Sequence, residues 1–292
     1  MLIGVVTRNP KSWCSTQLGE AIKRKGHDVI YINLSKVVAR IGEEPVIEYK
    51  GINLAKEVAA IIVRPIGRGS LEEVIFRLNI LHRLDMAGLP VINRPKAIEQ
   101  CVDKYHALML LERNGIPVPR TAVTEDVEAA LKLFLELGGD VIVKPLFGSR
   151  GLGIIRVNDF DLAVRVFRTL EIIGNVIYIQ EFIPHGTRDI RAFVVGDEVV
   201  ASMYREATSW KTNIAQGAKP KPAKLGSELE ELAIRAAKEI GCEVAGVDIL
   251  ESSKGYYVVE INSMPGWQGL QQISKINIAE KIVSYVINKV KE

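Results

Sequence analysis

Three side chains that could bind a cation lie in two short apolar segments near the C-terminus. Asp248 belongs to the segment AGVDIL, and Glu260 and Asn262 belong to VVEIN. Both segments are short and rich in β-branched residues, which predicts two β-strands. Because side chains alternate along a strand, Glu260 and Asn262 share one face. Val259 and Ile261 are then expected on the other face.

A divalent cation would explain why these acids occur together. If Asp248 lies on a strand beside Glu260, two unit charges about 4 Å apart repel by roughly 4 kcal/mol at an effective dielectric constant near 20. Mg²⁺ or Mn²⁺ bound by Asp248, Glu260 and Asn262 would reverse that repulsion. Mg²⁺ held by oxygen ligands usually accompanies a nucleotide phosphate. The alternative is that the three are separate polar residues of edge strands facing water.

A second group of candidates surrounds a loop that contains glycine. Lys144 ends an apolar run in the segment VIVKP, and the sequence LFGSRGLG follows this segment directly. Glycine lets a backbone approach a phosphate closely and present its N–H groups, although glycine turns without a ligand are common. A P-loop is excluded because GxxxxGK[ST] before a helix is missing. The candidate residues of the loop are Gly148, Ser149, Gly151 and Gly153.

Two further polar side chains each have a functional and an ordinary interpretation. Lys104 in VDKY precedes a predicted helix, and it either contacts a nucleotide or is a solvated lysine of the first turn. Glu181 follows an apolar strand, and it could accept a hydrogen bond from adenine or ribose or simply be exposed.

Arginines on two predicted strands could bind a phosphoryl group. Arg191 lies in RDIR at the start of one strand, and Arg205 ends its hairpin partner. The guanidinium fork makes bidentate contacts to carboxylates and phosphates. The alternative is cross-strand ion pairing with Asp189 or Glu206. No Ser-His-Asp arrangement or GxSxG segment occurs, which disfavours hydrolysis through a nucleophile.

The elements that must position these residues follow from the apolar pattern. The first third alternates strands (LIGVV, VIYINL, AAIIVRP, PVIN) with helices, which predicts a parallel α/β unit. GVVTRN replaces GxGxxG after the first strand, so a dinucleotide fingerprint is absent. Two strands around the glycine loop predict a hairpin-like flap, and residues 211–224 predict a mobile basic loop. The predicted helices cover residues 15–25, 71–87, 104–113, 125–137, 159–170, 227–240 and 278–290.

Composition limits the classes of protein. The 292 residues are 48% hydrophobic and 25% charged, and the net charge of +3 is too small to predict nucleic-acid binding. No run approaches the roughly 20 apolar residues of a membrane span, and no signal peptide follows Met1, so we expect a cytoplasmic protein. The three cysteines, Cys14, Cys101 and Cys242, form no CxxC pair, which disfavours a zinc site or a disulfide framework.

Seven ordered segments resemble one known family. DKY, VKPLFGSRGLG, YIQEFI, RDIRAFVVGDEVV, KTN, AGVDIL and EINSMPG are similar to the ATP-grasp superfamily, specifically to the RimK-like amino-acid ligases. The resemblance covers the chain from about Asn93 onward, whereas the N-terminal part resembles the family only in pattern. Within the family, RDIRAFVVGDEVVASMYR and EINSMPGW are most similar to archaeal tetrahydromethanopterin α-L-glutamate ligases.

The resemblance implies an ATP-grasp fold, α/β with an α+β C-terminal half, in which two β-layers clamp ATP. It implies an N-terminal domain (1–94), a central subdomain with a glycine lid (95–185) and a C-terminal subdomain with the Mg²⁺ site (186–292). Family members often carry Arg where Lys211 stands, which leaves the role of Lys211 less certain. The implied nucleotide ligands are Lys104 and Lys144 at the phosphates, the loop 147–153 as lid, Gln180, Glu181, Phe182 and Ile183 around adenine, Asp189 near the ribose, and Lys211 to Asn213.

The implied reaction joins L-glutamate to the terminal carboxylate of an acceptor similar to tetrahydromethanopterin, through an acyl phosphate that Arg191 and Arg205 would stabilise. Trp210, Trp267 and Tyr204 could line an acceptor pocket or fill a core. Two alternatives stay open: a ligase that glutamylates a protein C-terminus, and a regulatory protein that binds ATP without catalysis. A homodimer or homotetramer is the default expectation for such an enzyme.

Overall fold

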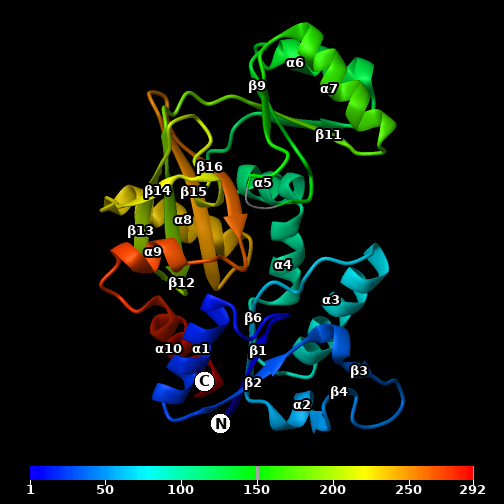
Figure 1. The fold of residues 1–292 in the computed structure, drawn as a ribbon, viewed down its shortest axis with the longest axis vertical. Coiled ribbons are helices and arrows are strands. Elements are labelled where there is room, and N and C mark those ends of the chain that lie inside the picture. The colour runs from blue at the N-terminus through cyan, green and yellow to red at the C-terminus, as the bar shows by residue number, and fades with distance from the viewer. Residues whose placement is uncertain (149–150, 292) are drawn as a thin grey trace.

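The computed structural model describes residues 1–148 and 151–291. Figure 1 shows three parts stacked along the long axis: a parallel sheet at one end, a five-stranded sheet in the middle and a small four-stranded sheet at the other end. These layers confirm the predicted combination of α/β and α+β parts. Within the described residues, no helix is both long and apolar enough to cross a membrane.

The N-terminal part is a parallel α/β unit, as predicted. Its elements are β1 (Leu2–Val6), α1 (Trp13–Arg24), β2 (Asp28–Ile32), η1 (Leu34–Lys36), β3 (Val38–Ala39), β4 (Ile47–Tyr49), β5 (Ile52–Asn53), α2 (Leu54–Glu57), β6 (Ala60–Val63), α3 (Leu71–Met86) and β7 (Val91–Ile92). The main sheet has the order β2-β1-β6-β7. Its strands are almost entirely apolar because α1 covers one face and α3 the other. The C-terminal helix α10 (Ile278–Lys291) lies beside α1 in Figure 1 and shares its core cluster.

The central part begins with two helices and continues into an antiparallel sheet. Its elements are α4 (Pro95–Val102), α5 (Lys104–Arg113), β8 (Thr121–Thr124), α6 (Val127–Glu136), β9 (Val141–Lys144), β10 (Ile155–Val157), α7 (Phe160–Ile172) and β11 (Ile177–Glu181). The order is β10-β9-β11-β8, and α6 and α7 pack on one face. Antiparallel pairing of β9 with β10 confirms the predicted flap. Asp103, Asp126 and Asp159 each cap a helix by accepting backbone N–H groups, which fixes where α5, α6 and α7 begin.

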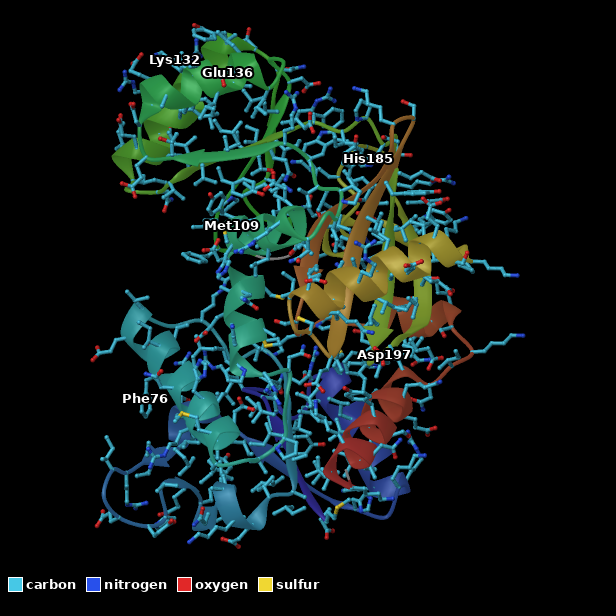
Figure 2. All side chains as sticks on the ribbon, turned by 180° about the vertical axis from the view of Figure 1, so that it is seen from behind. Phe76, Met109, Lys132, Glu136, His185 and Asp197 are labelled. Carbon is cyan, nitrogen blue, oxygen red and sulfur yellow. The ribbon has the colours of Figure 1, made fainter. Side chains whose placement is uncertain are left out.

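The C-terminal part is a five-stranded antiparallel sheet in the order β14-β13-β12-β15-β16. Its elements are β12 (Arg188–Val195), β13 (Glu198–Glu206), η2 (Ile214–Gln216), β14 (Lys219–Pro222), α8 (Ser227–Glu239), β15 (Val244–Ser252), β16 (Gly255–Asn262) and α9 (Gln268–Ile273). Figure 2 labels His185 and Asp197 at opposite ends of β12, so this strand runs from the small sheet toward the N-terminal part. The prediction of a basic loop was partly wrong, because residues 219–222 form β14. Its prolines are tolerated because β14 is an edge strand.

A β-bulge interrupts the regular pairing of the two strands that carry the metal candidates, β15 and β16. Asp248 pairs with Glu260, but the next pair is Ile249 with Val258, so Val259 is an extra residue in β16. Val258 and Ile261 lie in the core, whereas Val259 lines the same cavity as Glu260. The predicted position of Ile261 is confirmed and that of Val259 was wrong. The physical reason is that a bulge shifts the alternation by one residue.

Candidate functional site

A cavity of about 630 Å³, including its open mouth, lies between the small sheet and the five-stranded sheet. The cavity brings together most of the nucleotide and metal candidates, although Lys104, Arg191, Asn262 and the loop glycines are not in its lining. Ser149 lies outside the described residues. The candidates that line the cavity are Lys144, Gln180, Glu181, Phe182, Ile183, Asp189, Arg205, Lys211, Asn213, Asp248 and Glu260.

Arginine–aspartate pairs occupy the floor of the cavity. The strand register places Arg191 opposite Asp248, and Asp189 opposite Arg205. Arg191 makes a bidentate contact with Asp248, whose Nη2–Oδ2 distance is 2.7 Å, and Arg205 lies 2.9 Å from the same oxygen. Arg205 also donates from Nε to Asp189 at 2.6 Å, and the hydroxyl of Thr212 donates to Asp189 at 2.6 Å. The alternative of cross-strand ion pairing is therefore present for Arg205 with Asp189, whereas Arg191 pairs with Asp248.

These pairs control the charge of Asp248. Burial alone would raise the pKa of this carboxyl, but Arg191 and Arg205 outweigh burial and hold the pKa below its usual range. Asp248 is thus a stable anion inside the protein. A carboxylate has about four acceptor positions, so Asp248 can bind a further cation beside its arginines.

Glu260 has a different environment. Its carboxylate faces Asp248 across the strand pair but makes no hydrogen bond or ion pair to any residue in the described part of the chain. Burial, and then the charge of Asp248, raises the pKa of Glu260. Nδ2 of Asn262 is also buried, with no hydrogen-bond partner among residues 1–148 and 151–291. Rotating that amide would offer Oδ1 instead.

This donor set fits a hard divalent cation. Two carboxylates and an amide supply only oxygen, which Mg²⁺ and Mn²⁺ prefer. A cation would offset both the burial of Glu260 and its repulsion from Asp248. The fit depends on the amide, because the described residues include no cluster of three or more His, Cys, Asp or Glu side chains that could hold a metal.

Two lysines approach the site, Lys144 from the small sheet and Lys104 from the start of α5. Nζ of Lys144, at the end of β9, donates to Oε1 of Gln180 on β11 at 2.7 Å. Burial lowers the pKa of Lys144 to about 8, although Glu260 acts in the opposite direction. Nζ of Lys104 donates to the carbonyls of Leu146 and Gly148 at 3.2 and 3.0 Å. Lys104 is therefore not a solvated lysine of the first turn: it holds the start of the glycine loop.

The glycine loop touches the opposite wall of the cavity. Gly151 and Gly153 have φ angles of +72° and +77°, which L side chains rarely adopt. A Cβ on Gly153 would lie 2.8 Å from the ring of Pro145, so glycine is required there. Gln216 in η2 donates to the carbonyl of Gly151 at 2.7 Å. The loop thus connects the small sheet to the segment that contains Lys211 and Asn213.

Two family descriptions together cover nearly the whole chain. The RimK PreATP-grasp domain matches residues 1–98, and the RimK-like ATP-grasp domain matches residues 101–286. The chain belongs to the RimK-like ATP-grasp family. This confirms the resemblance found in the sequence, and the chain is a ligase of the class that forms C–N bonds.

Full-length relatives of this ATP-grasp chain occur in archaea and bacteria. Tetrahydromethanopterin:alpha-L-glutamate ligase of Methanococcus maripaludis is 35% identical over 100% of both chains, and that of Methanosarcina acetivorans is 36% identical over 98% of both. A probable alpha-L-glutamate ligase of Legionella pneumophila is 33% identical over 100% of this chain and 97% of its own. Because bacterial relatives match almost as well, an archaeal source is not confirmed.

Solved structures share the fold. The ATP-grasp ligase PsnB, complexed with a minimal precursor, Mg and ADP, superposes with a TM-score of 0.79 at 23% identity and covers 99% of this chain and 98% of its own. A RimK domain protein from Sphaerobacter thermophilus gives a TM-score of 0.77 at 22% identity and covers 98% and 100%. These values confirm the ATP-grasp architecture.

The three aromatic candidates for an acceptor pocket lie in different surroundings. Trp210 lines the cavity and meets Phe182 edge-on, with ring centroids 6.1 Å apart. Trp267 is only 1% exposed and packs in the core against Phe193, and it does not line the cavity that holds the nucleotide candidates. The core alternative was correct for Trp267 because its loop turns back toward the N-terminal part. Tyr204 is partly buried and packs at the edge of another core cluster.

Sequence reasoning missed partners that lie far away in the chain. Glu181 is not simply exposed: Arg120 donates to it from its backbone N–H and from Nε, each at 2.8 Å. Thr212 holds Asp189, and Asn93 reaches the end of β16 from the N-terminal part. Arg120 lies in the segment PRT and Asn93 in PVIN, and neither segment has a local pattern that indicates such contacts. The KTN segment of the family resemblance was the available signal for Thr212.

Proposed function

We propose that this protein is an ATP-dependent carboxylate–amine ligase that adds L-glutamate to the terminal carboxylate of a small-molecule acceptor. The observation that carries the proposal is Glu260. It is a partly buried acid without a partner in the described residues, it lies beside the anion Asp248, and the charges of Lys104 and Lys144 act on it. An acid in such a place needs a cation, and two lysines beside it suit a polyphosphate. The relatives named alpha-L-glutamate ligases support glutamate as the amino acid.

One group of residues would bind the nucleotide, and a second group would bind the cation beside its phosphates. Lys104 and Lys144 would contact phosphates, and Gln180, Glu181, Phe182 and Ile183 with Lys211 would surround the base. Asp189 would lie near the ribose, although its oxygens already accept from Arg205 and Thr212. Asp248, Glu260 and Asn262 would hold Mg²⁺ or Mn²⁺, which would neutralise phosphate charge when bound.

The reaction has two steps. An oxygen of the acceptor carboxylate attacks the γ-phosphorus of ATP, ADP leaves, and an acyl phosphate forms. The amino group of glutamate then attacks the acyl carbon, phosphate leaves, the nitrogen loses a proton, and an amide remains. Phosphoryl transfer is catalysed mostly by positioning and by charge neutralisation. Arg205, with Arg191 behind it, would stabilise the transferred phosphoryl group, and the glycine loop would exclude water from the acyl phosphate.

The relatives named for tetrahydromethanopterin favour a reduced pterin with a terminal carboxylate as the acceptor. Trp210 at the mouth of the cavity offers an aromatic face of the kind that a flat ring would need. We therefore place a pterin-like acceptor first among the substrates to test.

Mass spectrometry tests the proposal. The protein is incubated with ATP, Mg²⁺ and isotope-labelled glutamate in parallel with a reduced pterin, peptides ending in glutamate, and a protein extract. Labelled product on the pterin with one ADP per amide supports the proposal. Label found only on peptides or proteins would mean that the acceptor is a polypeptide and not a pterin. Tight ATP binding without any ADP release would favour a regulatory protein.

A further inference from the structure

One buried amide from the N-terminal part closes the end of the two strands that carry the metal candidates. Asn93 directly follows β7 and is 1% exposed. Its Nδ2 donates to the carbonyls of Val244 and Ser263 at 2.7 and 2.5 Å. Its Oδ1 accepts from the N–H groups of Glu243 and Val244 at 2.7 and 2.8 Å. These four bonds use both donors and both lone pairs of the amide.

The location of these bonds matters more than their number. The last pair in the ladder between β15 and β16 joins Gly246 to Asn262. Just beyond that pair, Asn93 connects Val244 at the start of β15 with Ser263, the residue after Asn262. The side chain thus takes the place of the next rung of the sheet. The ends of both strands are fixed to the N-terminal part and not only to each other.

A second residue fixes the same segment a little further on. Arg64 follows β6, the strand beside β7, and is 6% exposed. Its Nη1 donates to the carbonyl of Pro265 at 2.8 Å, and its guanidinium lies 4.9 Å from the ring centroid of Trp267. It pairs with no carboxylate in the described part of the chain. A buried cation without an acid is costly, so its contacts to Pro265 and Trp267, together with a side-chain hydrogen bond to Cys14, must satisfy it.

We infer that Asn93 and Arg64 are positioning residues for the cation site, acting through residues 263–265 on Asn262 and Glu260. The inference rests on the proposed function, because it assumes that these donors bind a divalent cation. Residues that orient metal ligands typically change metal affinity about 10–100-fold when they are replaced. The N-terminal part would then determine the geometry of a site to which it contributes no ligand.

Electron paramagnetic resonance of Mn²⁺ tests the inference without relying on turnover. The full-length protein is titrated with Mn²⁺ in the presence of ADP, and ADP binding without metal is measured separately by calorimetry. We expect Asn93→Ala and Arg64→Met to weaken Mn²⁺ binding about tenfold or more, while ADP affinity without metal changes less than about twofold. Arg64→Lys, which keeps a donor for Pro265, should restore most of the Mn²⁺ affinity.

Two control variants separate positioning from general damage. Leu54→Ala removes apolar contacts from α2 in another core cluster of the N-terminal part, and Leu54 does not line the small cavity that Asn93, Arg64 and Val244 share. It should lower the melting temperature while keeping Mn²⁺ affinity. Unchanged Mn²⁺ affinity in both Asn93→Ala and Arg64→Met, or an equal loss in Leu54→Ala, would overturn the inference. Glu260→Gln tests the underlying site: if this variant still binds Mn²⁺ normally, the metal assignment itself is wrong, and the positioning role fails with it.

Discussion

Glu260 and Asp248 are adjacent acids with opposite pKa shifts. Arginines keep Asp248 ionised, whereas burial and Asp248 raise the pKa of Glu260. Opposite shifts in a cavity are typical of functional sites. Within the described residues, the negative charge of Glu260 is repelled by Asp248 and is not fully compensated. We expect a bound cation to compensate it.

Replacing Glu260 with Gln should abolish most ligase turnover, by about 100-fold or more, because a cation ligand is lost. Without metal, the variant should unfold at the same or a higher temperature, since a partly buried acid that Asp248 repels is removed. Product formation and thermal unfolding measure the two effects. Glu251→Gln on β15, whose acid pairs with Arg188 outside the cavity lining, is the matched control and should stay active. Near-normal amide formation by Glu260→Gln would refute the metal assignment.

Lys144 should make nucleotide binding depend on pH. Burial lowers its pKa to about 8, so in the empty protein its ammonium is lost as pH rises through 8. A phosphate favours the ammonium, and binding must therefore take up protons near and above pH 8 and weaken as pH rises further. Calorimetry of ADP without metal, in buffers of different ionisation enthalpy, should show uptake at pH 8.5 and almost none at pH 6.5. Lys144→Arg should lose this uptake because arginine does not titrate there, and equal uptake in that variant would exclude Lys144 as its source.

Individual residues were predictable where a motif surrounds them. Lys144 and the loop glycines belong to such a segment, and the cavity contains Lys144 as expected. The partners were not predictable, because Arg120 meets Glu181, and Thr212 meets Asp189, only after strands distant in sequence are paired. Whether Arg191 and Arg205 contact aspartates depended on a register that the sequence left open.

At the scale of elements, the glycine loop is the feature on which the site most depends. Gly153→Ala should raise the KM for ATP several-fold, because the new Cβ would press on the stiff ring of Pro145 and displace the loop. Gly174→Ala is the matched control: Gly174 also has a positive φ, of +68°, but no atom lies within 4 Å of its added Cβ. Steady-state kinetics of both variants measure the effect. Equal KM values would show that the loop conformation is not needed to bind ATP.

The elements themselves were largely predictable from periodicity. The predicted helix 104–113 coincides with α5, and residues 127–136 form a helix where 125–137 was predicted. The bulge at Val259 was not predictable, since an apolar VVEIN segment looks the same with or without an extra residue. The strand β14 was missed because KPKP favours a loop unless an edge position is available.

At the scale of the whole molecule, the C-terminal helix belongs to the core of the N-terminal part. Ile282, Val283 and Val286 in α10 share a buried cluster with Leu18 and Ile22 in α1. The sequence predicts an amphipathic helix over 278–290, but it does not indicate which part of the molecule the helix covers. The proposed division into 1–94, 95–185 and 186–292 stays a prediction. The expected homo-oligomer stays a prediction.

A fragment containing residues 1–94 alone should be unstable. It lacks α10, whose five buried Ile and Val side chains contribute on the order of 7–15 kcal/mol, comparable to the roughly 5–15 kcal/mol that stabilises a whole domain. Circular dichroism should show no cooperative thermal transition for this fragment, whereas fusing residues 276–292 to it through a flexible linker should restore one. A cooperative transition of 1–94 at the melting temperature of the fused form would show that α10 is dispensable.

Transfer of oxygen from the acceptor tests the central claim most directly. The acceptor that yields labelled amide is prepared with ¹⁸O in its terminal carboxylate, and the phosphate released with ATP, Mg²⁺ and glutamate is examined by mass spectrometry. Ligation through an acyl phosphate predicts one ¹⁸O atom in each phosphate and one amide for each ADP. Phosphate without ¹⁸O, at the same yield of amide, would mean that ATP does not activate this carboxylate and would contradict the account.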